Sequence, residues 1–278
     1  MAHLDIMKPM TTFDTADDLS ARKQTIARHF ANASDYDQHA NIQQTVCQYL
    51  LDSIAHTKQS SVLEVGAGTG QMTRLLADHI QSEHWLINEL CGEHTATLQS
   101  TLPAADIMIG DAETIDLAEN HSLIISANAV QWFDNPLSFV MQSAQRLQSG
   151  GQLVFSTFTP NNFLQIKTLT GQGLHYPDIN EWQLALDSAS FENIELSIKR
   201  FDLPFPTPYA ILKHMKLTGV STNQTQVTSD DTQTFIWTKS RLQQFESDYW
   251  QQFSGKDETG QLMVNLTYEV LIVSAFKL

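Results

Sequence analysis

The chain is poor in cysteine and in basic residues. It has only two cysteines, Cys47 and Cys91, and no Cys-x-x-Cys pattern, so neither a disulfide framework nor a thiolate metal site is predicted. Its ten histidines are scattered without metal-ligand spacing, so no metal site is predicted. Only 16 Lys and Arg face 31 Asp and Glu, a net charge of -15. That balance argues against nucleic acid as a partner.

Long apolar runs are missing as well. No segment reaches the roughly 18 uninterrupted apolar residues that a membrane span requires. Residues 1–20 mix Asp, Thr and Lys and contain no apolar signal-peptide core. These absences predict a cytoplasmic protein with no membrane partner. Its 278 residues fit one core domain with an insertion better than two full domains.

A glycine loop is the most informative feature that is present. In residues 61–70 a run of β-forming residues opens onto Gly66, Gly68 and Gly70, and a helical segment follows. Glycines let the backbone turn sharply and approach a ligand closely, and a helix start offers unpaired N–H groups. Gln71 breaks the dinucleotide fingerprint, which needs a third glycine there. The loop predicts a nucleotide-type cofactor, with a ligand-free strand-to-helix turn as the alternative.

Polar residues end three further predicted strands. Glu89 ends a strand at 84–90, Asp111 follows one at 106–110, and Asn128 ends one at 122–128. In a doubly wound sheet ligands bind at the carboxyl ends of the strands, and an acid after the second strand binds ribose hydroxyls. Taken singly, Glu89 and Asp111 would be ordinary solvated acids. Their succession at strand ends predicts a single site.

The order of elements predicts an α/β fold, a doubly wound sheet that is mostly parallel with an antiparallel last strand. An amphipathic segment at 24–54 precedes the first strand, and four β/α units and a fifth strand at 151–158 follow it. The remaining expected elements are helices at 161–171 and 180–189, an alternating strand at 191–203 that Pro204 and Pro206 stop, and a final strand at 262–276.

The glycine pattern, with Glu64 two residues before Gly66, and the pair Asp111-Ala112 resemble motifs of class I S-adenosylmethionine-dependent methyltransferases. The resemblance implies a Rossmann-like core, S-adenosyl-L-methionine as cofactor, and an antiparallel hairpin formed by the last two strands. It also implies a helical cap at 1–58, a core at 59–203 with 262–278, and a helical substrate lid inserted at 204–261.

By the same resemblance, Glu64 would hold the amino group of the cofactor, Glu89 its ribose and Asp111 its adenine. Tyr36 would cover the methionine part of the cofactor. The alternative is that Tyr36 is an ordinary half-buried aromatic residue whose hydroxyl is solvated. The cofactor-binding residues implied are Tyr36, Gln43, Glu64, Gly66, Ala67, Gly68, Glu89, Asp111, Ala112 and Asn128.

Three segments narrow the resemblance. Residues 26–30 with the following Tyr36, residues 126–132 and residues 212–220 are similar to the malonyl-acyl-carrier-protein O-methyltransferases of biotin synthesis. The segment 169–176 departs from the best-known members. The implied reaction methylates the free carboxylate of malonyl carried by acyl carrier protein or by coenzyme A. Because a carboxylate is already ionised at neutral pH, no catalytic base is expected.

Gln131 and Trp132 would line the acceptor pocket and position the substrate, although a Trp after a strand is also a common core residue. The acceptor also needs cationic groups, either to pair the malonyl carboxylate or to dock an acidic carrier protein. Residues 199–241 form the one basic region of the chain, and solvated lysines are its plain alternative. The candidates there are Arg200, Lys213, Lys216, Lys239 and Arg241.

Two other functions stay open on sequence grounds. A class I methyltransferase acting on another small carboxylic acid or a quinone-like acceptor would need no basic docking surface. A non-enzymatic binding module could keep the fold, but the intact Glu64, Gly66, Gly68 and Asp111 argue against a decayed site.

Overall fold

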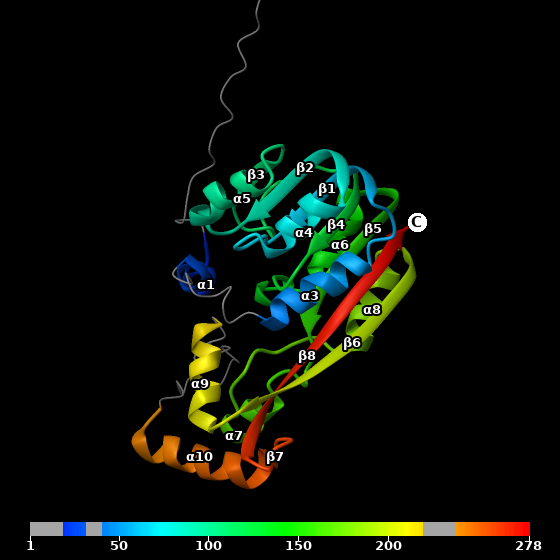
Figure 1. Cartoon of the computed structure of the whole chain (residues 1–278). Helices are drawn as coiled ribbons and strands as arrows, with labels where there is room; N and C mark the ends of the chain where they lie inside the picture. Colours follow the sequence, from blue (N-terminus) through cyan, green and yellow to red (C-terminus); the bar gives the residue numbers. More distant parts are fainter. Residues whose placement is uncertain (1–18, 32–40, 219–236) are drawn as a thin grey trace, which may run out of the picture.

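A computed structural model describes residues 19–31, 41–218 and 237–278 (Figure 1). The described residues form an eight-stranded sheet in the order β3-β2-β1-β4-β5-β8-β6, with β7 paired to β8. Strands β1 to β5 are parallel, and β8 runs antiparallel to β5 and β6. The predicted doubly wound sheet with an antiparallel last strand is confirmed. The strands are β1 Lys58–Val65, β2 Gln81–Glu89, β3 Asp106–Ile109, β4 His121–Ser126, β5 Leu147–Phe158, β6 Phe191–Phe205, β7 Ser254–Lys256 and β8 Leu262–Lys277.

Helices cover both faces of the sheet. One apolar cluster joins it to α3, α4 and α5, and a second joins it to α6 and α8. Neighbouring strand residues alternate between them, since Val62 packs in the first and Leu63 in the second. The helices are α1 Ala21–Ala31, α3 Asn41–Asp52, α4 Gln71–His79, α5 Thr95–Thr101, α6 Ser138–Arg146, α7 Leu164–Thr170, α8 Ile179–Ser188, α9 Pro208–Leu217 and α10 Lys239–Phe253, with short 3-10 turns at Gly92–His94 and Val130–Trp132. Within the described ranges, no helix has the length and apolar character needed to cross a membrane.

Two expectations about individual elements were wrong. The third β/α unit has no α-helix among its described residues, and a turn in which the Ile115 amide donates to the Asp111 carbonyl at 2.8 Å leads towards β4 instead. Pro204 does not stop β6, because it pairs in register with Asn265 of β8. At the edge of a sheet, a proline can occupy a position whose missing N–H needs no strand partner.

The β6–β8 hairpin extends well past the rest of the sheet. Pairing of β5 with β8 reaches only Val270, whereas β6 follows β8 as far as Val264. The outer part of the hairpin carries α7, α9 and α10 (Figure 1). We call this outer part of the hairpin with α7, α9, α10 and β7 the outer lobe. The predicted insertion at 204–261 lies in it, except that residues 219–236 fall outside the described residues.

Candidate functional site

The sheet order reverses between β1 and β4, and the loops that leave these two strands lie close together. Gly66 has a φ of +71°, and a Cβ added to it would lie 2.4 Å from the Cβ of Ala129. The Gly66 amide donates to the Asn88 carbonyl at 2.9 Å, which joins the loop to β2. A glycine is therefore needed where the loops after β1 and β4 meet.

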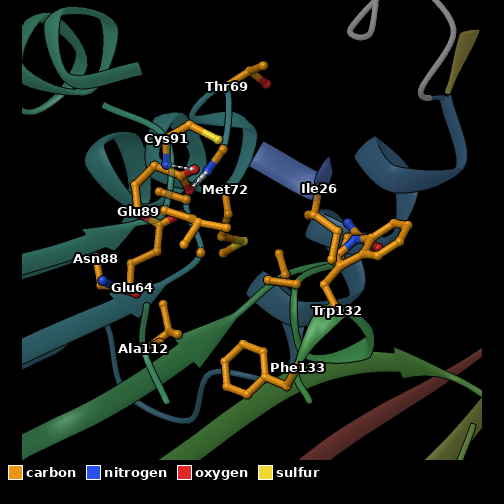
Figure 2. Close-up of a pocket in the computed structure, with 18 of the residues that line it drawn as sticks. Ile26, Glu64, Thr69, Met72, Asn88, Glu89, Cys91, Ala112, Trp132 and Phe133 are labelled. Carbon is orange, nitrogen blue, oxygen red and sulfur yellow. Dashed lines mark hydrogen bonds between the residues drawn. The ribbon is translucent and has the colours of Figure 1, made fainter. Parts of the chain in front are cut away.

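A pocket opens at this reversal (Figure 2). The space inside it, open solvent included, is about 950 Å³. Its walls come from α1, α3, the start of α4 and the loops after β1, β2, β3 and β4. The described residues that line it include Lys23, Ile26, Cys47, Glu64, Gly66, Ala67, Gly68, Met72, Asn88, Glu89, Cys91, Asp111, Ala112, Asn128, Trp132 and Phe133.

Glu64 is a buried carboxyl with one oxygen left over. The side chain is 2% exposed, and its Oε2 accepts a hydrogen bond from the Thr73 hydroxyl at 2.8 Å. Its Oε1 has no hydrogen-bond partner in the part of the chain that the structure describes. Burial, with a smaller contribution from nearby Glu89, raises the pKa of Glu64 to about 7. An ammonium group bound in the pocket would satisfy this oxygen and favour the ionised form.

Glu89 is held at the end of β2 by two backbone amides. Its Oε2 accepts from the Gly68 amide at 2.7 Å, and its Oε1 accepts from the Cys91 amide at 2.9 Å. Glu89, Cys91 and His94 lie close enough to share a cation. Burial first, and the charge of Glu89 second, raise the pKa of the Cys91 thiol and keep it protonated, which disfavours thiolate ligation. The oriented carboxylate suits hydroxyl donors instead.

Asn128 stands at the end of β4 in the left-handed region, with φ +54°. Its amide donates to the Ser156 hydroxyl at 2.9 Å, and its Nδ2 donates to the Gln43 carbonyl at 3.3 Å. Gln131 donates from Nε2 to the Asn128 carbonyl at 2.6 Å. Hydrogen bonds with Gln43 and Gln131 thus hold Asn128 in place.

The structure brings most of the predicted cofactor residues into one pocket. Gln43 is buried beside it and contacts Asn128 through its main chain, and Tyr36 lies outside the described residues. Trp132 lines the pocket, whereas Gln131 is buried and does not. The predicted residues that line it are Glu64, Gly66, Ala67, Gly68, Glu89, Asp111, Ala112, Asn128 and Trp132. What each residue binds stays a prediction.

The five basic candidates do not line this pocket. Lys213 and Lys216 are exposed on α9, and Lys239 and Arg241 are exposed in the first turn of α10. Arg200 lies on β6 and pairs with Asp202 at 3.2 Å. Their proposed contact with an acceptor therefore concerns another surface.

Sequence reasoning missed Lys23, which lies on α1 and lines the pocket. It is 4% exposed and forms ion pairs with Asp111 and Glu113. No spacing signalled this contact, because Lys23 and Asp111 are separated by 88 positions. The one available signal is the strongly acidic 111–119 segment, which has no basic residue of its own to neutralise it.

Known proteins share both the fold and the sequence. A family model described as a methyltransferase domain matches residues 63–155. The YcgJ protein of Bacillus subtilis has a TM-score of 0.57 at 13% identity, over 84% of this chain and 97% of that one. The N-methyltransferase NodS of Bradyrhizobium japonicum, solved with S-adenosyl-L-homocysteine, has a TM-score of 0.50 at 13% identity, over 93% and 99%. These two show the fold, and the architecture is that of a class I methyltransferase.

The sequence match is more specific. The malonyl-acyl-carrier-protein O-methyltransferase of Haemophilus influenzae is 35% identical over 92% of this chain and 95% of its own length. The pocket fits an S-adenosyl-L-methionine cofactor: Glu64 has an oxygen with no partner among the described residues, which could accept from an amino group, and the Glu89 carboxylate, held by two amides, could accept from hydroxyl groups. The chain belongs to the malonyl-acyl-carrier-protein O-methyltransferase family.

Proposed function

We propose that this protein methylates the free carboxylate of malonyl attached to acyl carrier protein, using S-adenosyl-L-methionine. The methyl ester would then prime pimeloyl synthesis for biotin. The observation that carries the proposal is the similarity to carrier-protein methyltransferases along nearly the whole chain, outer lobe included. Malonyl-coenzyme A is the alternative form of the acceptor.

Each part of the cofactor would contact different residues of the pocket. The cofactor's amino group would pair with Glu64, its ribose hydroxyls would donate to Glu89, and its adenine would lie against Asp111 and Ala112. Asn128 would lie beside the methionine half, with Gln43 and Tyr36 behind or over it. The buried oxygen of Glu64 that has no partner among the described residues supports this orientation most directly.

The chemistry requires little from the protein beyond placement. When bound, the cofactor supplies a methyl group on a positively charged sulfur, which a carboxylate oxygen can accept. The titratable residues that line the described pocket are Lys23, Cys47, Glu64, Glu89, Cys91 and Asp111, and each has a cofactor-side or structural contact. No base is needed for an ionised carboxylate. The protein would act by aligning the two reactants and excluding water, and alignment alone can supply on the order of 7–11 kcal/mol.

Acceptor binding would involve Trp132 at the pocket and the outer lobe. We propose residues 204–261 as the substrate lid and residues 1–58 as a cap. On α9, Tyr209, Lys213 and Lys216 follow helical spacing on the face opposite Ile211 and Met215, which are buried. Tyr209 is 65% exposed, and both lysines are exposed. An aromatic beside two cations fits an acidic carrier protein.

Methyl transfer to three acceptors would test the proposal. Labelled S-adenosyl-L-methionine is offered with malonyl-carrier protein, malonyl-coenzyme A or free malonate, each at low and high salt. We expect label on the carrier protein, in an amount that falls as salt rises. Equal transfer to malonyl-coenzyme A at every salt would favour that alternative form of the acceptor. Transfer to none of the three, with cofactor still bound, would overturn the proposed acceptor and leave another small acid or a quinone-like molecule to be sought.

A further inference from the structure

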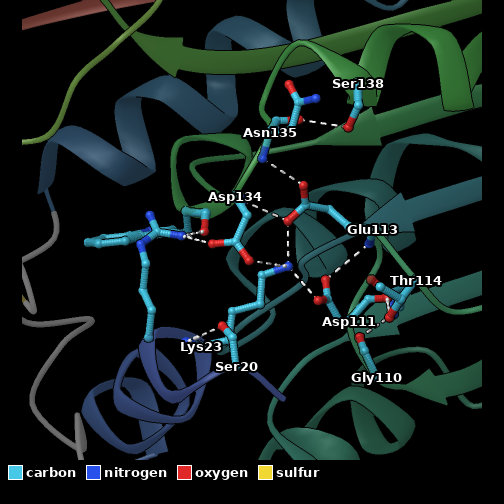
Figure 3. Close-up of polar contacts among 12 residues, drawn as sticks. Ser20, Lys23, Gly110, Asp111, Glu113, Thr114, Asp134, Asn135 and Ser138 are labelled. Carbon is cyan, nitrogen blue, oxygen red and sulfur yellow. Dashed lines mark hydrogen bonds and ion pairs between the residues drawn. The ribbon is translucent and has the colours of Figure 1, made fainter. Parts of the chain in front are cut away.

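Helix α1 is attached to the loops that follow three different strands. The Cys91 thiol, after β2, donates to the Ala27 carbonyl at 3.4 Å. Lys23 donates to the carboxylates of Asp111 and Glu113, after β3 (Figure 3). Arg22 donates to the Trp132 carbonyl, after β4, at 3.0 Å. These loops build the pocket, so α1 contacts the site at several separate points.

Lys23 stands between carboxylates that would otherwise repel one another. The side chains of Asp111 and Glu113 are 12% and 10% exposed, and that of Lys23 is 5% exposed. A third carboxylate, that of Asp134, lies 3.8 Å from the Lys23 Nζ and 2.6 Å from Arg22. Burial alone would lower the pKa of Lys23, but its hydrogen bonds and ion pairs with Asp111 and Glu113 raise it. Lys23 therefore stays charged, and the carboxylates can lie together.

Glu113 extends this contact to the loop after β4. Its Oε2 accepts from the Asp134 amide at 2.7 Å, and its Oε1 accepts from the Asn135 amide at 2.8 Å. The loop of Asp111, on the adenine side, is thereby joined to the loop of Trp132, on the acceptor side (Figure 3). Lys23 lies where the two loops meet.

We infer that Lys23 is a positioning residue, which holds Asp111 through charge neutralisation, and that docking of α1 and binding of the cofactor are coupled. The pocket is complete only with α1 in place, because Lys23 and Ile26 form part of its wall. Coupling is reciprocal, so bound cofactor stabilises docked α1 by the same factor by which docked α1 improves cofactor affinity. The inference rests on the proposed placement of the cofactor and not on the acceptor.

Calorimetry with S-adenosyl-L-homocysteine separates this inference from the proposed function. Absence of binding to the unaltered protein would count against the proposed cofactor placement itself. Given binding, Lys23→Met keeps an unbranched side chain that is one atom shorter and removes its charge, and we expect affinity to fall at least about tenfold, the size of a typical coupling. The matched control Lys58→Met, at an exposed position on β1, should bind as the unaltered protein does.

A second substitution distinguishes charge neutralisation from simple tethering. Lys23→Met with Glu113→Gln removes one of the two adjacent carboxylate charges, and it should recover several-fold of the lost affinity. If Lys23 acted only as a tether, the double variant would bind no better than the single one. An unchanged affinity in Lys23→Met, or no recovery in the double variant, overturns the inference.

Hydrogen exchange on the unaltered protein covers the case in which Lys23→Met does not fold. Saturating S-adenosyl-L-homocysteine should slow exchange of the amides in α1, Ala21–Ala31, while leaving unchanged the amides of α8, which does not line the pocket. Equal exchange of α1 with and without ligand contradicts the coupling.

Discussion

The cofactor pocket and the outer lobe are built on different principles. In the pocket, residues from four strand ends line one space, Gly68 and Glu89 from two of them are joined by a hydrogen bond, and several are almost fully buried. In the outer lobe, the predicted basic residues are exposed and spread over α9, α10 and β6, and Arg200 is paired with its own neighbour Asp202. An enclosed pocket can thus hold a small ligand by its geometry, whereas a broad charged surface can bind a protein partner.

Substitution of Gly66 should have the largest effect, because the pocket requires the loops after β1 and β4 to approach each other closely at this residue. In Gly66→Ala the added Cβ would meet Ala129 at 2.4 Å. Overpacking costs about 1–3 kcal/mol, and a side chain at positive φ about 1 kcal/mol more. We expect loss of S-adenosyl-L-homocysteine binding in calorimetry and this loss of stability in urea unfolding.

Gly68→Ala is the matched control for that variant. Gly68 also has a positive φ, +55°, but a Cβ there meets nothing within 4 Å. In urea unfolding only the backbone cost of about 1 kcal/mol is expected. The control applies to stability alone, because Gly68 itself lines the pocket. Equal destabilisation by the two substitutions would show that the contact with Ala129 is unimportant.

Glu64 should give the next largest effect and a distinctive pH dependence. Its raised pKa of about 7 means that the free protein holds a proton at lower pH, and pairing with an ammonium group releases it. Affinity for S-adenosyl-L-homocysteine should rise about tenfold between about pH 6 and pH 8 and then level off. Glu64→Gln should weaken binding by about 1.5–3 kcal/mol and flatten this profile, because a charged hydrogen bond is lost.

The raised pKa of Glu64 should affect the stability of the ligand-free protein in the opposite direction, so that stability falls as pH rises. A carboxyl whose pKa is raised on folding stabilises the ligand-free fold most below its unfolded value of 4.5, and this contribution is lost as pH rises through about 7. The thermal shift produced by ligand should therefore be larger at about pH 8 than at about pH 6. Retention of the full pH dependence in Glu64→Gln would assign it to another group.

Substitution of Trp132 should separate acceptor binding from cofactor binding. The side chain lines the pocket and is half-buried. We expect Trp132→Ala to lower turnover with malonyl-carrier protein by about 10–100-fold while leaving cofactor affinity within about threefold, since misplacement of an acceptor affects mainly alignment. A loss of more than about 3 kcal/mol in unfolding would instead identify Trp132 as a core residue.

The outer lobe should give the smallest and most salt-dependent effect. Lys213→Gln with Lys216→Gln should raise KM for malonyl-carrier protein about three- to tenfold at low salt, with kcat and cofactor affinity unchanged, because exposed charges act mainly on encounter. The difference should vanish at high salt. Lys58→Gln, at the far end of β1, is the control. An equal rise of KM in this variant would show that the effect depends on net charge and not on the position of the lysines.

Strand-end residues were predictable because the topology of a doubly wound sheet brings successive carboxyl ends to one edge. Glu64, Glu89, Asp111 and Asn128 could thus be grouped from the order of the strands, and they line or border one pocket. Lys23 could not be grouped with them, since no local pattern says where a separate helix packs. Pro204 was misjudged because its tolerance depends on β6 being an edge strand, a property of the whole sheet.

The amino-acid sequence by itself determined the parallel sheet, the glycine loop and the acids at the strand ends, because hydrophobic periodicity and backbone freedom act over a few neighbouring residues. Only the tertiary structure decided that α1 supplies Lys23 to Asp111 and Glu113, that Gln131 donates a hydrogen bond to the Asn128 carbonyl, and that the five basic candidates lie outside the pocket. These outcomes depend on packing between segments far apart in the chain, which no local pattern encodes.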